Sequence, residues 1–247
     1  MRQMQAESVD LVVTSPPYDD LRNYKGFSFD FENVAKELFR IVKLGGVIVW
    51  IVSDATKDYS ESGTSFRQAL YFKEIGLNLF DTMIWIKDGG GAVGSNLCYT
   101  QNFEYMFVFS KGKPKSINLI YDKECKTFTG VEKTVRESRG GNDKGDRGFT
   151  SFTRREMSRR NNWWYLCPQS QDGSKWHPAV FPEVLVRDHI LSWSNEGDLV
   201  LDPFMGSGTT AKVARALGRH YIGFEISQEY VDLANKRLQD TKTLFDL

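Results

Sequence analysis

The chain has 247 residues, and its 32 lysines and arginines balance 32 aspartates and glutamates, so its formal net charge is zero. This balance excludes a uniformly basic nucleic-acid coat protein and an acidic disordered chain. Hydrophobic residues make up 40% and charged residues 26%, which is ordinary for a globular chain long enough to bury a sizeable core. We therefore expect one large domain, with room for one small insert.

No segment has the pattern of a membrane span or a secretory signal. The longest apolar runs have the length of a strand and fall short of the ~20 residues that cross a bilayer. Residues 1–10 are polar and lack the apolar centre of a signal peptide. The three cysteines, Cys98, Cys125 and Cys167, lack the spacing of metal ligands. The expectation is a cytoplasmic protein that binds no metal.

Strand-like and helical patterns alternate along the first half of the chain. The apolar run 9–14 ends in a Pro-Pro turn and predicts a buried strand. Apolar residues at helical spacing predict a helix over 31–42, closed by Gly45 and Gly46. The next predicted elements are a strand at 47–53, a helix at 64–75, a strand at 79–87, a glycine-rich loop at 88–94 and a strand at 105–110.

The same alternation returns near the C-terminus. The predicted elements there are a helix at 182–193, a strand at 198–201, a helix at 206–217, a strand at 220–225 and a helix at 228–238. Strands that alternate with helices in this way are typical of an α/β fold with a doubly wound, mostly parallel sheet.

A stretch with excess positive charge separates the two halves. Residues 111–160 contain 14 lysines and arginines against 7 aspartates and glutamates, and no apolar period is sustained over 123–158. We interpret it as an irregular insert. Its candidate contacts to nucleic-acid phosphates are Arg154, Arg155, Arg159 and Arg160, for which the alternative is a solvated face. The pair Trp163 and Trp164 is interpreted as core packing.

The segment DPFMGSGTT, residues 202–210, follows a predicted strand and opens a predicted helix. This order brings backbone N–H groups to a nucleotide-like ligand, and Gly206 and Gly208 permit the tight turn. Glu225 ends the next strand, near the ~20-residue offset after Asp202 that is expected for a carboxylate binding ribose hydroxyls. The lysine of a Walker loop is absent, which favours a ligand without a phosphate tail.

A second candidate site is TSPPY, residues 14–18, at the carboxyl end of the first predicted strand, where open α/β sheets bind ligands. The two prolines lack N–H donors, so nearby carbonyls can accept hydrogen bonds from an amino group. Ser15 adds a hydroxyl, and Tyr18 offers a ring on which a base can stack. Taken alone, the segment is better interpreted as a strand-ending turn with a packing tyrosine.

Four motifs together resemble the beta group of the amino-directed DNA methyltransferases, which use S-adenosylmethionine to methylate adenine N6 or cytosine N4. They are TSPPY at 14–18, HPAVFP at 177–182, VLDPFMGSGTT at 200–210 and GRHYIGFEISQEYVDLANKRL at 218–238. The catalytic motif precedes the cofactor motif, as in that group. The resemblance implies a Rossmann-like domain with a catalytic half at 1–110, a basic target-recognition insert at 111–175 and a cofactor-binding half at 176–247.

The resemblance also implies roles for single residues. Those implied to be catalytic are Ser15, Pro16, Pro17 and Tyr18, and those implied to bind S-adenosylmethionine are Asp202, Phe204, Gly206, Gly208, Thr209, Glu225, His177 and Pro178. The chemistry is compatible. An amine that donates to the Pro16 carbonyl and the Ser15 hydroxyl is favoured in a tetrahedral form, which takes a methyl group directly from a sulfonium.

The implied substrate is double-stranded DNA with its target base flipped out. A cognate restriction endonuclease is a candidate partner, and the working form is a monomer or a homodimer. Ser15 stands where adenine-specific members mostly carry Asp, so cytosine N4 is favoured and adenine N6 is the alternative. Three further alternatives are an RNA enzyme, a protein glutamine enzyme, and an impaired DNA-binding remnant that lacks the Gly-Asp strand usual ahead of residues 1–13.

Overall fold

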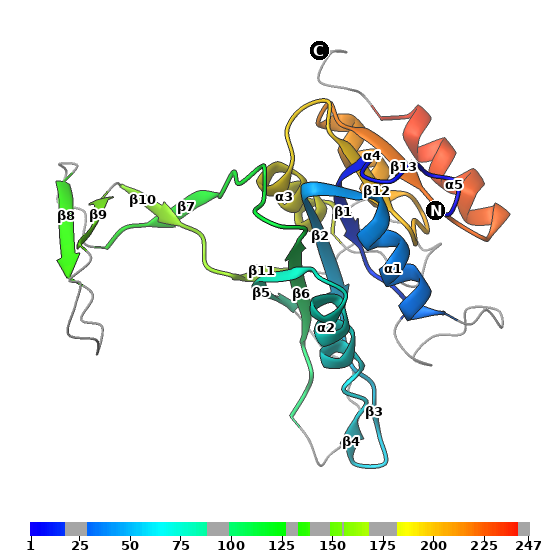
Figure 1. The fold of residues 1–247 in the computed structure, drawn as a ribbon, viewed down its shortest axis with the longest axis horizontal. Coiled ribbons are helices and arrows are strands. Elements are labelled where there is room, and N and C mark those ends of the chain that lie inside the picture. The colour runs from blue at the N-terminus through cyan, green and yellow to red at the C-terminus, as the bar shows by residue number, and fades with distance from the viewer. Residues whose placement is uncertain are drawn as a thin grey trace. The chain divides into compact units, whose positions relative to one another are not determined.

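The computed structural model describes residues 1–17, 29–87, 99–126, 133–138, 149–154, 156–167 and 182–241 (Figure 1). The chain forms two compact units. The first joins Met1–Asn118 with Asn162–Leu247, and the second is Leu119–Asn161. Among the described residues, no helix is long and apolar enough to cross a membrane.

A seven-stranded sheet forms the centre of the first unit, in the order β11-β5-β6-β2-β1-β12-β13. The strands are β1 (Val9–Thr14), β2 (Val42–Val52), β5 (Asn78–Lys87), β6 (Phe103–Ser110), β11 (Trp163–Leu166), β12 (Leu199–Asp202) and β13 (His220–Gly223). Strand β6 runs antiparallel to β2 and β5, and every other pairing in this sheet is parallel. The prediction of a mostly parallel α/β sheet is confirmed.

Helices cover both faces of this sheet (Figure 1). They are α1 (Phe31–Ile41), α2 (Thr64–Glu74), α3 (Glu183–Trp193), α4 (Thr209–Ala216) and α5 (Gln228–Gln239). Leu38 of α1 and Phe72 of α2 belong to a buried core with Trp50 of β2. On the opposite face, His189 of α3 lies 3.3 Å from the sulfur of Met106 in β6. Because both faces are covered, all six residues of β1 are buried.

The helix predicted over 31–42 is not closed by the two glycines. Helix α1 ends at Ile41, and Val42 is already extended and begins β2. The Nζ of Lys111 donates to the carbonyl of Val42 over 3.1 Å, so a side chain helps to satisfy the carbonyls at the end of this helix. Gly45 and Gly46 lie inside β2, where Gly45 has a φ of +85°. The predicted glycine cap is therefore wrong.

The second unit contains two antiparallel strand pairs. Strand β7 (Tyr121–Glu124) pairs with β10 (Met157–Arg159), and β8 (Lys133–Ser138) pairs with β9 (Phe149–Arg154). The interpretation of an irregular insert is therefore wrong for these segments. Antiparallel pairing uses backbone groups, so polar strands form it without the apolar period that sequence analysis detects.

Two short elements of the first unit also escaped prediction. Strands β3 (Thr56–Lys57) and β4 (Ser60–Glu61) form a small hairpin after β2. Strand β11 places Trp164 in the interior, whereas Trp163 and Tyr165 on its other side are 50% and 59% exposed. The interpretation as core packing is thus confirmed for Trp164 and wrong for Trp163.

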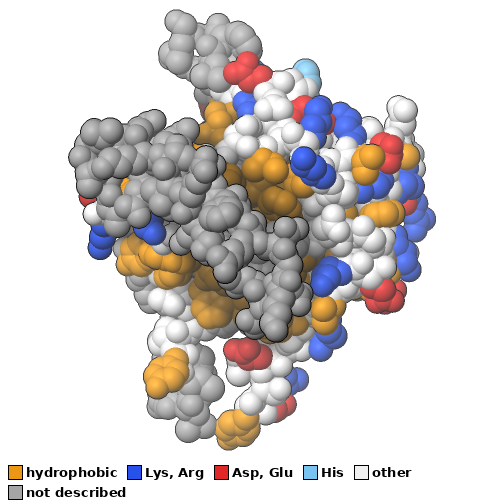
Figure 2. Space-filling model, turned by 60° about the vertical axis from the view of Figure 1, so that its left-hand side comes forward, with side chains coloured by type: hydrophobic (Ala, Val, Ile, Leu, Met, Phe, Trp, Pro, Cys, Tyr) orange, Lys and Arg blue, Asp and Glu red, His pale blue; other side chains and the backbone are white. Residues whose placement is uncertain are grey.

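Hydrophobic side chains also form several patches on the surface in view in Figure 2.

Candidate active site

The two segments predicted to carry the chemistry lie side by side. Strands β1 and β12 are parallel neighbours, with Leu11 opposite Val200 and Val12 opposite Leu201. The ends of both strands therefore meet at the carboxyl edge of the sheet, where this class of fold binds its ligands. Residues 15–17 continue from β1 at this edge, and residues 203–208 continue from β12.

A buried hydrogen bond connects these segments directly. Thr14 Oγ1 donates to Asp202 Oδ1 over 2.7 Å, and the amide of Phe204 donates to the same oxygen over 3.0 Å. From α4, Thr210 Oγ1 lies 3.3 Å from the carbonyl oxygen of Val13. The start of the SPP turn is thus tied to both ends of the glycine loop. Thr14 and Thr210 fall within the two candidate segments, but sequence analysis assigned no role to either, because neither contact has a local sequence pattern.

Asp202 has an unusual environment for a carboxyl group, since it is only 2% exposed. Burial raises its pKa from 3.8 to about 6, and the hydrogen bonds from Thr14 and from the Phe204 amide act in the opposite direction. This carboxyl therefore changes charge close to neutral pH. Its Oδ1 accepts the bond from Thr14 that links the two segments, and a direct contact of this carboxyl with a cofactor stays a prediction.

The loop before α4 has the tight turn expected from its glycines. Gly206 and Gly208 have φ values of +51° and +81°, in the left-handed region that favours glycine. The amide of Gly208 donates to the carbonyl of Met205 over 2.9 Å. A β-carbon on Gly208 would lie 2.7 Å from Cβ of Ala234 in α5. Gly208 is therefore required for helix packing as well as for the turn.

Glu225 follows β13 and binds the glycine loop. Its Oε2 accepts the amide of Gly206 over 2.8 Å, and its Oε1 accepts the amides of Ile226 and Ser227 over 2.9 Å each. The side chain is partly exposed, so a carboxylate with about four acceptor positions can still bind a hydroxyl. Ile226 is 68% exposed, and sequence analysis missed this apolar side chain beside the acid.

The remaining site residues of the two segments differ in exposure. Pro16 is buried, whereas Ser15 and Pro17 are partly exposed at the end of β1. Phe204 packs its ring against Phe29 and Trp50, at centroid distances of 5.1 and 6.3 Å. The aromatic contacts anchor the glycine loop to the core between the sheet and α1. Tyr18, His177 and Pro178 lie outside the described residues.

The four arginines predicted to meet phosphates have different surroundings within the second unit. Arg155 lies outside the described residues, and Arg154 belongs to β9, of which only the backbone is described. Arg159 is exposed on β10. Arg160 forms an ion pair with Asp122, to which its Nε donates over 2.8 Å, and this bond holds the pKa of Asp122 below its usual value.

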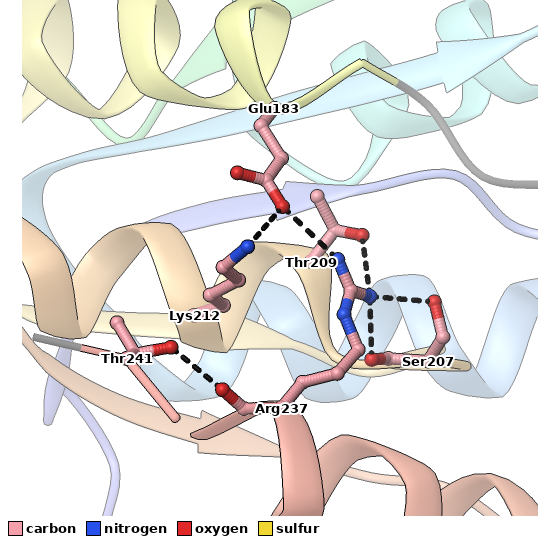
Figure 3. Close-up of polar contacts among 6 residues, drawn as sticks. All are labelled: Glu183, Ser207, Thr209, Lys212, Arg237 and Thr241. Carbon is pink, nitrogen blue, oxygen red and sulfur yellow. Dashed lines mark hydrogen bonds and ion pairs between the residues drawn. The ribbon is translucent and has the colours of Figure 1, made fainter. Parts of the chain in front are cut away.

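A cluster of charged and hydroxyl side chains supports the glycine loop (Figure 3). Arg237 of α5 donates from Nη1 to the carbonyl oxygen of Ser207 over 2.8 Å and to its Oγ over 2.9 Å. Nη2 of Arg237 lies 3.0 Å from Oε1 of Glu183, which also accepts Lys212 Nζ over 2.7 Å. Sequence analysis missed the charged members of this cluster, Glu183, Lys212 and Arg237, because they come from three different helices.

The sheet order, the glycine turn before α4 and the acid at the end of β13 define an α/β enzyme for a nucleotide-like cofactor. The family profile for DNA methylases of the N6 and N4 type matches residues 9–236. The chain therefore belongs to the amino-directed DNA methyltransferases, a family that depends on S-adenosylmethionine.

A relative is similar to this chain in sequence, and two solved structures are similar to it in fold. The chain is 54% identical over 238 residues to the orphan methyltransferase M.BamHII of Bacillus amyloliquefaciens. The matched region covers 94% of this chain and 89% of that protein. The fold is similar to the cytosine-N4-specific PvuII DNA methyltransferase, with a TM-score of 0.70, 21% identity and coverage of 98% and 83%. It is also similar to M1.HpyAVI in complex with S-adenosylmethionine, with a TM-score of 0.61, 24% identity and coverage of 94% and 89%.

Proposed function

We propose that this chain transfers the methyl group of S-adenosylmethionine to an exocyclic amino group of a flipped base in double-stranded DNA, with cytosine N4 favoured. The observation that carries the proposal is the hydrogen bond between Thr14 and Asp202, which holds the SPP turn against the glycine loop. An amino group at the turn and a sulfonium at the loop would then be neighbours, as direct transfer requires.

The cofactor fits the described residues by their chemistry. The partly exposed carboxylate of Glu225 would accept the ribose hydroxyls, and the exposed Ile226 beside it would contact the adenine ring. The loop around Gly206 and Gly208, with Thr209 at the start of α4, would face the carboxylate of the methionine part. Asp202 and Phe204 would support the loop through their contacts with Thr14 and with the aromatic core. His177 and Pro178 would lie near the methionine part.

The chain's own groups would prepare the base for reaction. An exocyclic amine is a poor nucleophile, because its lone pair is delocalised into the ring. Hydrogen bonds to the Pro16 carbonyl and the Ser15 hydroxyl would favour the tetrahedral nitrogen, and Tyr18 would hold the flipped base by stacking. The bound cofactor would supply an activated methyl group, so no covalent link between enzyme and base is needed.

The preference for cytosine rests on Ser15, since family members with Asp at this place are mostly adenine enzymes. Adenine N6 is the alternative. Incubating the chain with labelled S-adenosylmethionine and duplex DNA, then digesting the DNA to nucleosides, distinguishes N4-methylcytosine from N6-methyladenine. We expect N4-methylcytosine. Label in N6-methyladenine alone would reverse the preference, and unlabelled DNA across a wide range of sequences would contradict the function.

Two further parts of the proposal concern partners. The unit Leu119–Asn161 would contact DNA, since Arg154, Arg155, Arg159 and Arg160 all fall in it. The relative at 54% identity is named an orphan methyltransferase, which supports an enzyme that works without a cognate restriction endonuclease. A DNA substrate also supports the expected cytoplasmic location.

A further inference from the structure

Arg237 contacts the glycine loop from thirty residues further along the chain. Its Nη1 lies 2.8 Å from Ser207 O, 2.9 Å from Ser207 Oγ and 3.3 Å from Thr209 Oγ1. The side chain is 12% exposed. Figure 3 shows the guanidinium directed from α5 at the loop, with Glu183 on its other side. One charged group therefore binds three acceptors, two on Ser207 in the loop and one on Thr209 at the start of α4.

The loop needs such a contact because its glycines leave its conformation open. Ser207 lies between Gly206 and Gly208, and glycine accepts several backbone conformations at little cost. The bond from Arg237 fixes the Ser207 carbonyl, while the amide of the same peptide unit, that of Gly208, donates to Met205 O. In the described part of the chain, the amide of Ser207 donates to no acceptor, and Ser207 is only 4% exposed.

The guanidinium is itself held from the other side. Glu183 Oε1 accepts from Arg237 Nη2 over 3.0 Å and from Lys212 Nζ over 2.7 Å. Glu183 lies in the first turn of α3, where the helix dipole favours a carboxylate. Ala234, three residues before Arg237 on the same face of α5, approaches the loop at Gly208. This face of α5 therefore sets both the position and the orientation of the loop.

We propose that Arg237 is a positioning residue, which holds the Ser207 peptide so that the loop amides meet the carboxylate of the cofactor's methionine part. The inference rests on the proposed S-adenosylmethionine site and adds to it a residue that does not touch the cofactor. This role predicts that the loss of Arg237 affects only some of the contacts with the cofactor. Loss of Arg237 weakens the contact with the carboxylate and leaves the contacts of Glu225 and Ile226 with ribose and base in place.

A calorimetric binding experiment on the full chain can distinguish the contacts with the carboxylate from those with ribose and base, by comparing two ligands. S-adenosylhomocysteine has the amino-acid carboxylate, and 5′-methylthioadenosine lacks it. In Arg237→Met we expect the affinity for S-adenosylhomocysteine to fall about tenfold or more, as for lost hydrogen bonds to a charged group, and that for 5′-methylthioadenosine to change less than about twofold. Arg237→Lys keeps the charge without the planar fork and should lose an intermediate amount.

Lys212→Met is the matched control, because it removes the other cation bound to Glu183. It should leave the ratio of the two affinities at its wild-type value. Should Arg237→Met not fold, Arg237→Lys and Glu183→Gln carry the same test, with a smaller change in the same ratio. Equal weakening of both ligands, or no weakening of either, would overturn the positioning role. A wild-type chain that binds neither ligand would contradict the proposed function instead.

Discussion

At the scale of single residues, Asp202 links the stability of the fold to pH. Its pKa in the folded chain is about 6, against an ordinary value of 3.8, because the carboxyl is buried. Between these pH values the folded chain binds a proton that the unfolded chain has lost. The resulting stability is therefore fully present below about pH 4 and is lost as the pH rises through about 6. The total is on the order of 3 kcal/mol.

Asp202→Asn tests this link, since the amide oxygen can still accept from Thr14 and from the Phe204 amide but cannot ionise. We expect the free energy of unfolding of the wild type to contain a decrease between about pH 4 and pH 6 that is missing from the variant, as measured by urea titration. Asp232→Asn, at an exposed position of α5, should keep the wild-type decrease. Identical pH profiles for wild type and Asp202→Asn would contradict the assigned burial effect.

At the scale of elements, the packing of α5 on the glycine loop explains why residue 208 is glycine. Gly208→Ala would place its Cβ 2.7 Å from Cβ of Ala234, in a backbone conformation that costs a non-glycine residue ~1–2 kcal/mol. We therefore expect a loss of stability as well as of cofactor affinity. The sequence alone predicts only the loss of cofactor affinity, because a pattern of glycines does not reveal the helix behind them.

A double-mutant cycle separates the two costs at residue 208. Ala234→Gly alone should cost roughly 0.5–1 kcal/mol, because glycine weakens a helix. Combined with Gly208→Ala, it removes the 2.7 Å contact between the two β-carbons and leaves the 3.2 Å contact with Cα of residue 234 and the backbone strain. The double variant should therefore be more stable than the sum of the single effects predicts, as measured by denaturant unfolding. Strict additivity would show that the loop moves away from α5 without cost.

The elements that could be predicted are those that local sequence determines. Helix α2 was predicted over 64–75 and spans Thr64–Glu74, because its apolar spacing is regular. Strands β7 and β10 could not be predicted, since their stability depends on backbone pairing across more than thirty residues. The same holds at the site. The glycine turn was predicted, whereas the bond from Thr14 to Asp202 joins residues 188 positions apart.

At the scale of the whole molecule, zero net charge conceals an uneven distribution. The basic excess falls in 111–160, which covers all but the last residue of the unit Leu119–Asn161. The remaining residues carry 18 lysines and arginines against 25 aspartates and glutamates, so a neutral chain can bind DNA through its basic segment while the net negative remainder is repelled by phosphate. Ion pairing inside the unit decides how many cations are available, and Arg160 with Asp122 is the described example.

Salt dependence of DNA binding measures these contacts directly. If Arg159 meets a phosphate, Arg159→Ala should flatten the slope of log affinity against log salt by about 0.9 with the same sequence preference. Asp122→Asn removes the partner of Arg160 and should strengthen binding at low salt, because the guanidinium no longer divides its bonds between a carboxylate and DNA. In Arg160→Ala that gain from Asp122→Asn should disappear.

If instead Arg159→Ala costs ~1–3 kcal/mol at one base pair only, Arg159 reads a base. Unchanged slope and preference in Arg159→Ala and Arg160→Ala would assign both arginines to a solvated face.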